Sequence, residues 1–317
     1  MRKKKLLIRL ISVLLLLALA GCGEAPAAKE PAGGDAICFT DDLGREVSVT
    51  SHQRVAVLIG SFADIWCIAG GKDSIVATAN DSWTSFDLGL DESVQNLGAI
   101  KTPSVEVLLA SQPDLVIGSC NTASNVEMKE TLEAAGITVA YFDVQNFEDY
   151  LRMLDICTRI TGQRGNYEIY GTALKQQIEE AIARQDGSAP KVLCIRATGS
   201  SCKIKGSTDN LLGEMLADLG CVNIADNDNA ILEELSMEAI LQADPDYVFA
   251  VLQGQDSEAA MQAMEAALLS HPAWSTLRAV QTGNFYMLDN SLYNLKPNAR
   301  WGEAYEKLAD ILYPAEN

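Results

Sequence analysis

A pattern of fourteen residues that occurs twice, 132 residues apart, is the feature that most constrains the fold of this chain. Ser104–Ile117, with the sequence SVEVLLASQPDLVI, aligns with Ser236–Phe249, SMEAILQADPDYVF, and matches it at six positions. In each copy a short helical stretch precedes a Pro-Asp pair and an apolar run, which is typical of a helix, a turn and a buried strand. The repeat predicts two lobes built on one plan.

Alternation of β-rich and amphipathic segments predicts the fold class. Short apolar runs suited to strands occur at 55–59, 75–77, 115–117, 138–142, 192–195, 247–251 and 285–288, and helical spacing lies between them. This alternation is typical of parallel α/β sheets. We therefore expect an α/β protein with two Rossmann-like lobes, each with a parallel-rich sheet.

The long helical pattern over residues 148–186 divides the chain into domains. Its apolar spacing continues far beyond an average helix, and Gly162 and Gly165 are the only expected break. We interpret it as one connecting helix between an N-terminal lobe, 37–147, and a C-terminal lobe, 187–317.

The N-terminus has the pattern of a secretory signal. Arg2, Lys3, Lys4, Lys5 and Arg9 make the start of the chain basic, and the mainly apolar stretch Leu6–Ala20, 15 residues that include Arg9, is too short for a comfortable membrane span. The stretch closes with Leu19-Ala-Gly-Cys22, which resembles the lipobox of bacterial lipoproteins. The resemblance implies a signal peptide over 1–21, a lipid-modified Cys22 that anchors the protein outside the cytoplasm, and a flexible tether over 22–36.

The charge of the chain argues against nucleic acid as a partner. The sequence has a net charge of −19, and removal of residues 1–21 leaves 19 basic and 43 acidic side chains, a net charge of −24. Such a chain repels phosphate backbones. The seven cysteines beyond Cys22 show neither a CxxC pair nor zinc-ribbon spacing, and the two histidines, His52 and His271, are too few for a histidine-rich site. We expect no metal site of the protein's own.

The loops after the predicted strands hold the candidate ligand-binding residues. In open α/β sheets, ligands collect beyond the carboxyl ends of the strands. Aromatic side chains would supply flat walls there, and amides, a hydroxyl and one arginine would supply directional polar contacts. The predicted ligand-binding residues are Ser61, Trp83, Phe86, Asn121, Arg196, Tyr293 and Asn294.

Catalysis has little support in the sequence, which lacks a Gly-x-Ser-x-Gly elbow. An exported enzyme that uses the same cleft is the alternative, and it would need Asp81, Asp87 or Glu233 as acid and base. A surface adhesin is a third possibility, and it predicts no small-molecule cleft.

Several segments together resemble the substrate-binding proteins of ABC importers for iron-siderophore, haem and cobalamin. They are Thr40–Val47 (TDDLGREV), Arg54–Leu58, the two Pro-Asp units, Gly206–Gly220, His271–Trp274 and Ala279–Tyr286. The resemblance implies two lobes joined by one long helix, a monomer without catalytic activity or an intrinsic cofactor, and capture of a metal chelate between the lobes. It also implies delivery to a permease dimer with its ATPase.

The resemblance assigns roles to individual residues as well. It implies that Glu106 and Glu238, which the repeat aligns, dock on the permease. Only Tyr293 and Met128 could serve as haem ligands, and the basic groups available to the cleft are Arg196, Lys203, Lys205 and Arg300. This set favours a neutral hydroxamate-like ferric chelate or a corrinoid over a triscatecholate. The long connector is expected to limit movement between the lobes.

Overall fold

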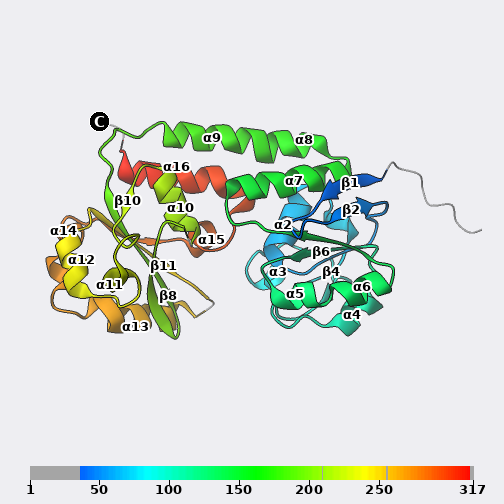
Figure 1. The fold of residues 1–317 in the computed structure, drawn as a ribbon, viewed down its shortest axis with the longest axis horizontal. Helices are drawn as coiled ribbons and strands as arrows, with labels where there is room; N and C mark the ends of the chain where they lie inside the picture. The colour runs from blue at the N-terminus through cyan, green and yellow to red at the C-terminus, as the bar shows by residue number, and fades with distance from the viewer. Residues whose placement is uncertain (1–35, 209, 255, 315–317) are drawn as a thin grey trace, which may run out of the picture. The chain divides into compact units, whose positions relative to one another are not determined.

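The computed structural model describes residues 36–314 apart from residues 209 and 255. The predicted signal peptide, the lipidation site Cys22 and all of the predicted tether except its last residue lie outside the described residues. Two separate parallel sheets organise the described part of the chain (Figure 1). None of its helices combines the length and the apolar character needed to cross a bilayer.

The N-terminal lobe is built on a five-stranded sheet in the order β5-β4-β3-β6-β7, with every neighbouring pair parallel. All residues of β6 are buried, as expected for a parallel strand covered on both faces. One face packs on α2, and the other packs on α4, α5 and α6. The elements are β3 (Val55–Val57), α2 (Gly60–Ile68), β4 (Ile75–Thr78), α3 (Asp81–Thr84), β5 (Gln95–Asn96), α4 (Val105–Ala110), β6 (Leu115–Ser119), α5 (Ala123–Glu127), α6 (Lys129–Ala134) and β7 (Thr138–Phe142), with a 3-10 turn at Lys72–Ser74.

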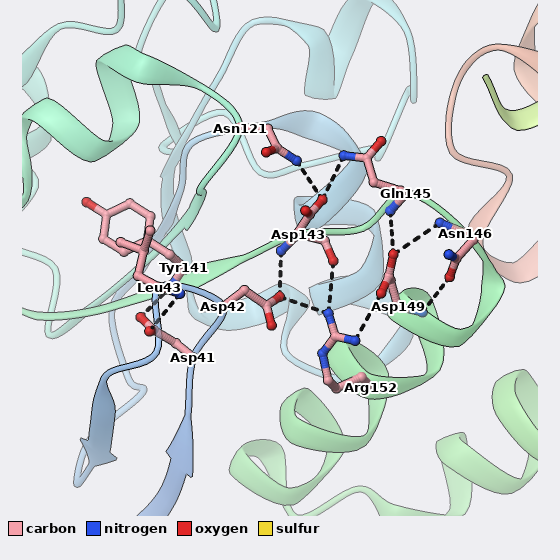
Figure 2. Close-up of polar contacts among 10 residues, drawn as sticks. All are labelled: Asp41, Asp42, Leu43, Asn121, Tyr141, Asp143, Gln145, Asn146, Asp149 and Arg152. Atoms are coloured by element: carbon pink, nitrogen blue, oxygen red, sulfur yellow. Dashed lines mark hydrogen bonds and ion pairs between the residues drawn. The ribbon is translucent and has the colours of Figure 1, made fainter. Parts of the chain in front are cut away.

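An antiparallel hairpin, β1 (Ile37–Thr40) and β2 (Glu46–Val49), is tied to this lobe by two aspartates in its turn. The buried carboxylate of Asp41 accepts the backbone N–H of Tyr141 in β7 at 3.2 Å. Asp42 accepts the backbone N–H of Asp143 at 2.6 Å and pairs with Arg152 at 3.0 Å (Figure 2). The Asp-Asp pair of the TDDLGREV segment therefore has a structural role.

The range predicted as one connecting helix contains two helices. The first is α7 (Phe147–Thr161), which begins at a capping box formed by Asn146 and Asp149. Gly162 follows it with φ +72°, a left-handed conformation that ends helices. Helical structure then resumes as α8 (Arg164–Tyr167), a π-helical turn (Glu168–Thr172) and α9 (Ala173–Ile182). The break thus falls at one of the two glycines where the sequence predicts one.

The C-terminal lobe has a second parallel sheet in the order β10-β8-β11-β12, and β9 pairs antiparallel with the carboxyl half of β8. Residues of α10 and α16 cover one face, and residues of α11, α12, α13 and α14 cover the other. The elements are β8 (Lys191–Thr198), β9 (Ser201–Lys205), α10 (Leu211–Asp218), β10 (Val222–Asn223), α11 (Asn229–Leu232), α12 (Met237–Ala243), β11 (Tyr247–Leu252), α13 (Ser257–Met264) with a π-helical turn (Glu265–Leu269), a 3-10 turn (Trp274–Thr276), α14 (Arg278–Gln281), β12 (Phe285–Leu288), α15 (Asn290–Tyr293), a 3-10 turn (Asn298–Arg300) and α16 (Trp301–Leu312).

The two copies of the sequence repeat begin with the same helix cap. Ser104 precedes α4, and its hydroxyl accepts the N–H of Val107 at 3.3 Å. Ser236 precedes α12, and its hydroxyl accepts the N–H of Ala239 at the same distance, 3.3 Å. A serine in this position satisfies one of the free N–H groups at a helix start.

The aspartates of the two Pro-Asp pairs also have equivalent contacts. The backbone N–H of Asp114 donates to the carbonyl of Arg54 at 2.8 Å, and that of Asp246 donates to the carbonyl of Lys191 at 2.8 Å. The two carboxylates accept the N–H groups of the same partners, at 3.2 Å from Arg54 and 2.8 Å from Lys191. Each aspartate therefore fastens the start of one strand to the start of its neighbour. The duplicated plan predicted from the sequence is present in both lobes.

One apolar cluster joins the two lobes. It covers one face of each sheet and includes residues of α2, α7, α9, α10 and α16. Figure 1 shows α9 and α16 side by side, and these two helices are in contact. Trp301 of α16 is buried within the cluster, with its ring centroid 5.7 Å from that of Phe147 and 6.5 Å from that of Tyr150, both in α7. This packing supports the expectation that the lobes move little relative to each other.

A polar contact reinforces the same junction. Asn298, which is 0% exposed, donates from its amide to the carbonyl of Ser61 at 2.9 Å and to the carboxylate of Asp64 at 2.8 Å. Both acceptors lie in α2, while Asn298 precedes α16. Burial raises the pKa of Asp64, and the hydrogen bond from Asn298 opposes this shift. Asn298 has φ +49°, a conformation that asparagine tolerates better than most residues.

Replacing Asn298 with glycine should destabilise the protein by about 1–3 kcal/mol, because the half-buried Asp64 and the Ser61 carbonyl then lose this donor. Glycine preserves the backbone conformation, so the loss would report the amide alone. Gln112→Gly is the matched control, since Gln112 has φ +48° and is exposed. Urea unfolding should show a lower midpoint for Asn298→Gly only, and equal midpoints would contradict the assigned role.

Candidate functional site

A cavity of about 410 Å³ in the C-terminal lobe brings together three of the predicted ligand-binding residues. Arg196 comes from β8, and Tyr293 and Asn294 come from the end of α15 and the residue after it. Gln145, which lies between β7 and α7, contributes to the lining from the other lobe. The complete lining is Gln145, Arg196, Thr208, Asn210, Leu211, Glu214, Tyr293, Asn294 and Lys296.

Tyr293 lines this cavity with its ring rather than its hydroxyl. The side chain is 3% exposed, and the hydroxyl donates to the carbonyl of Ala304 in α16 at 3.1 Å. Burial raises the pKa of Tyr293, so its oxygen remains protonated at neutral pH. Tyr293 can therefore supply an apolar wall, and its hydroxyl serves its own lobe.

Lys296 is the main lining residue that the sequence reasoning missed. It is half-buried, and burial lowers its pKa, while the carboxylates of Asp143, Glu214 and Asp149 act in the opposite direction. Its ammonium group makes neither a hydrogen bond nor a salt bridge with any described residue. The available signal was its place two residues after Asn294, in a loop that ends at Pro297.

The other basic residues proposed for the cleft do not line this cavity. Lys203 is exposed on β9, and Lys205 is half-buried at the end of the same strand. Arg300 forms a two-pronged pair with Glu303 at 2.6 and 2.9 Å. This pairing lowers the pKa of Glu303 to about 2 and raises that of Arg300. Among these candidates, Arg196 alone reaches the cavity.

A second cavity of about 670 Å³ lies at the carboxyl ends of β4 and β6 in the N-terminal lobe, and it contains Asn121. The amide of Asn121 donates to Asp143 at 2.5 Å, and the same carboxylate oxygen accepts the amide of Gln145 at 2.7 Å (Figure 2). Asp143 thus links a residue of this cavity to a residue of the first. The lining is Asn80, Asp81, Thr84, Ser85, Ala99, Ile100, Lys101, Asn121, Thr122, Ala123 and Ser124.

The remaining predicted ligand-binding residues line neither cavity. Ser61 is buried in the first turn of α2, where its carbonyl accepts the Asn298 amide. Trp83 and Phe86 are half-buried in and just after α3, which also contributes Asp81 and Thr84 to the second cavity. Direct contact of Ser61, Trp83 and Phe86 with a ligand stays a prediction.

Asp81 is fixed in the second cavity by the start of α2. One carboxylate oxygen accepts the N–H of Gly60 at 2.8 Å, and the other is buried without a partner among the described residues. Burial raises the pKa of Asp81. Asp87 and Glu233, the other residues that the enzyme alternative requires, are exposed and line neither cavity. The three carboxylates are therefore not gathered in either cavity.

Glu106 and Glu238 occupy equivalent exposed positions. Each is in the first turn of its helix, two residues after the capping serine. A carboxylate there interacts favourably with the helix dipole and remains accessible to a partner.

Within residues 36–314, apart from 209 and 255, no group of three or more His, Cys, Asp or Glu side chains is placed to hold a metal ion. The seven described cysteines are all free thiols, and no disulfide links them. Burial raises the pKa of Cys202 to about 11 and that of Cys221 to about 12, which keeps both thiols protonated at neutral pH.

Gly60→Ala should disturb the second cavity, because an added Cβ would lie 2.7 Å from the Asp81 carboxylate and 2.8 Å from the backbone N of Ser82. We expect a loss of stability of about 1–3 kcal/mol. Gly165→Ala in α8 is the control, since nothing lies within 4 Å of its Cβ and alanine favours a helix. Thermal unfolding should separate the two variants, and an unchanged midpoint for Gly60→Ala would contradict the close contact.

Comparison with known proteins agrees with this architecture. A family model described as periplasmic binding protein matches residues 55–292. No curated protein sequence matches the chain.

Solved structures share the fold. A periplasmic binding protein from Veillonella parvula superposes with a TM-score of 0.71 at 18% identity, covering 88% of this chain and 92% of that one. The periplasmic haem-binding protein HutB of Vibrio cholerae gives 0.66 at 21% identity, covering 83% and 100%. Staphylococcus aureus SirA, solved with staphyloferrin B, gives 0.65 at 18% identity, covering 87% and 97%. At these identities the likeness shows the fold, and the match over 55–292 shows that the chain belongs to the periplasmic binding protein family, whose members are solute-binding proteins of transporters and not enzymes.

Proposed function

We propose that this protein is the substrate-binding component of an ABC importer, which captures an iron-siderophore or a related metal chelate such as haem or cobalamin. The observation that carries the proposal is the C-terminal-lobe cavity, where Arg196, Asn294 and Lys296 converge in a fold of the periplasmic binding protein family. Two structures with this fold are HutB, a haem-binding protein, and SirA, which was solved with staphyloferrin B.

The location proposed for the protein is the outer side of the cytoplasmic membrane. The basic start, the apolar stretch and the Leu19-Ala-Gly-Cys22 tetrapeptide support lipid attachment at Cys22. More than one acyl chain would make such an anchor stable. The strongly acidic chain suits a soluble, monomeric receptor that does not bind nucleic acid.

Docking on a permease dimer with its ATPase is assigned to Glu106 and Glu238. Their support is the repeated geometry, with the same serine cap and the same position in the first turn of α4 and α12. One exposed carboxylate on each lobe could engage both halves of a dimeric permease. Exposed charge pairs contribute more to orientation and encounter rate than to affinity, which suits a carrier that must dock and leave.

Tryptophan fluorescence of the full-length protein in detergent offers a direct test of cargo binding. Trp83 is half-buried beside the N-terminal-lobe cavity, whereas Trp66, Trp274 and Trp301 are buried. A ferric hydroxamate, a ferric catecholate, haem and cobalamin should be titrated separately, and one class should quench with saturation below about 1 μM. Trp83→Phe should remove most of the quenching, because it removes the half-buried tryptophan and keeps an aromatic ring at this position. Absence of binding by all four would contradict the proposed function.

The double variant Glu106→Ala with Glu238→Ala should bind cargo normally but fail to support uptake in cells, because it keeps the cavities and loses both docking charges. Glu130→Ala with Glu258→Ala is the matched control, since these glutamates are also exposed in the first turns of their helices, α6 and α13. Normal uptake by the first double variant would contradict the docking assignment.

A further inference from the structure

The side chains of two cations in the C-terminal-lobe cavity have no partner among the described residues. The side chains of Arg196 and Lys296 both line the cavity of about 410 Å³. Neither makes a hydrogen bond or a salt bridge with any residue that the structure describes. Both are half-buried, so bulk water solvates each of them only in part.

An arginine side chain without a partner is unusual among the described residues of this protein. The sequence has 43 acidic and 24 basic side chains, so carboxylates are abundant. Within residues 36–314 every other arginine donates to a carboxylate or a carbonyl oxygen: Arg45, Arg54, Arg152, Arg159, Arg164, Arg184, Arg278 and Arg300. Arg196 is the exception, and it occurs in a cavity.

The half-buried ammonium group of Lys296 also needs a counter-charge. Removing an ammonium group from water is unfavourable unless a counter-charge compensates it. Glu214 lines the same cavity, and it acts on Lys296 together with Asp143 and Asp149, but none of them forms a salt bridge with it. Among the described residues of the lining, Glu214 is the one carboxylate beside two cations. The described lining residues therefore favour the binding of an added negative charge.

We propose that the cargo carries a carboxylate group, which binds between the Arg196 guanidinium and the Lys296 ammonium. The inference rests on the proposed function and narrows its substrate class. A guanidinium presents paired donors that match the two oxygens of a carboxylate, and an ammonium adds a point charge with rotatable donors. Bound there, the cargo supplies a counter-charge that no described residue gives these two side chains through a salt bridge.

This assignment revises the ranking of cargo classes made from the sequence. A neutral hydroxamate chelate or a neutral corrinoid would leave both cations without a counter-charge from the cargo. Carboxylates can come from two sources within the proposed function, the hydroxycarboxylate ligands of a ferric chelate or the propionates of haem. Both fit the same pair of residues, so the probes must tell them apart.

Isothermal titration of the full-length protein in detergent with four probes tests the inference. Ferric citrate and haemin carry carboxylates, whereas ferrichrome and cyanocobalamin are neutral chelates. One of the first two should bind at least about tenfold more tightly than either neutral probe. Tighter or equal binding of a neutral probe would overturn this inference and leave the proposed function standing. Binding of none of the four would overturn this inference, and the proposed function would fall with it only when the ferric catecholate also failed to bind.

Variants connect the result to the two residues. Arg196→Gln and Lys296→Met should each weaken binding of the carboxylate probe by about tenfold to a hundredfold, and Lys296→Arg should restore most of the loss. Lys203→Met is the matched control, because Lys203 is an exposed cation of the same lobe outside the cavity. An effect of Lys296→Met no larger than that of Lys203→Met would overturn the inference.

Stability provides a second readout that a purely structural lysine would not give. If Lys296 serves the cargo, the unliganded Lys296→Met variant should unfold at the same temperature as the parent or a higher one, because it removes an uncompensated charge. Lower stability together with weaker binding would instead indicate a structural role and would overturn the inference.

Discussion

The apolar cluster shared by the two lobes is the constraint on which the rest of the structure depends. Residues of α2, α7, α9, α10 and α16 pack as one core under one face of each sheet, and Trp301 packs against Phe147 within this core. The buried Asn298 amide adds hydrogen bonds to α2. Because these elements cannot slide without opening a packed interior, the cavities near the carboxyl ends of the two sheets are held in place. A binding site that is already formed loses little free energy to reorganisation when its cargo arrives.

The use of charge differs between the framework and the cavity. Asp41 and Asp42 bind backbone N–H groups and arginines around the hairpin turn, and Asp114 and Asp246 bind backbone N–H groups at the strand starts of the repeat. These carboxylates stabilise the fold. In the C-terminal-lobe cavity the balance is reversed, since the described part of the lining has two cations and one carboxylate. An acidic protein repels anions over most of its surface, so a local pair of cations is the feature that would let it retain one.

The local sequence pattern predicted most strands of the two sheets. Strands such as Thr138–Phe142 and Phe285–Leu288 are continuous apolar runs between turn residues, which can be recognised from the sequence. The hairpin β1–β2 and the strand β9 were not predicted, because antiparallel additions this short depend on neighbours distant in sequence. In the site, Arg196 and Asn294 could be found from their position after strands. For Lys296 the only signal was its place two residues after Asn294, and its half-burial in the cavity depends on tertiary packing that the local sequence does not show.

The most direct test of the account is a crystal structure of the full-length protein loaded with the cargo that binds in solution, with the metal located by anomalous scattering. The account predicts one metal chelate per chain in the cavity lined by Arg196, Asn294 and Lys296, with an anionic group of the chelate contacting the two cations. It also predicts that α7, α9 and α16 keep the packing they have without ligand. A chelate bound away from this cavity, or a liganded form in which Trp301 has left Phe147, would contradict the account.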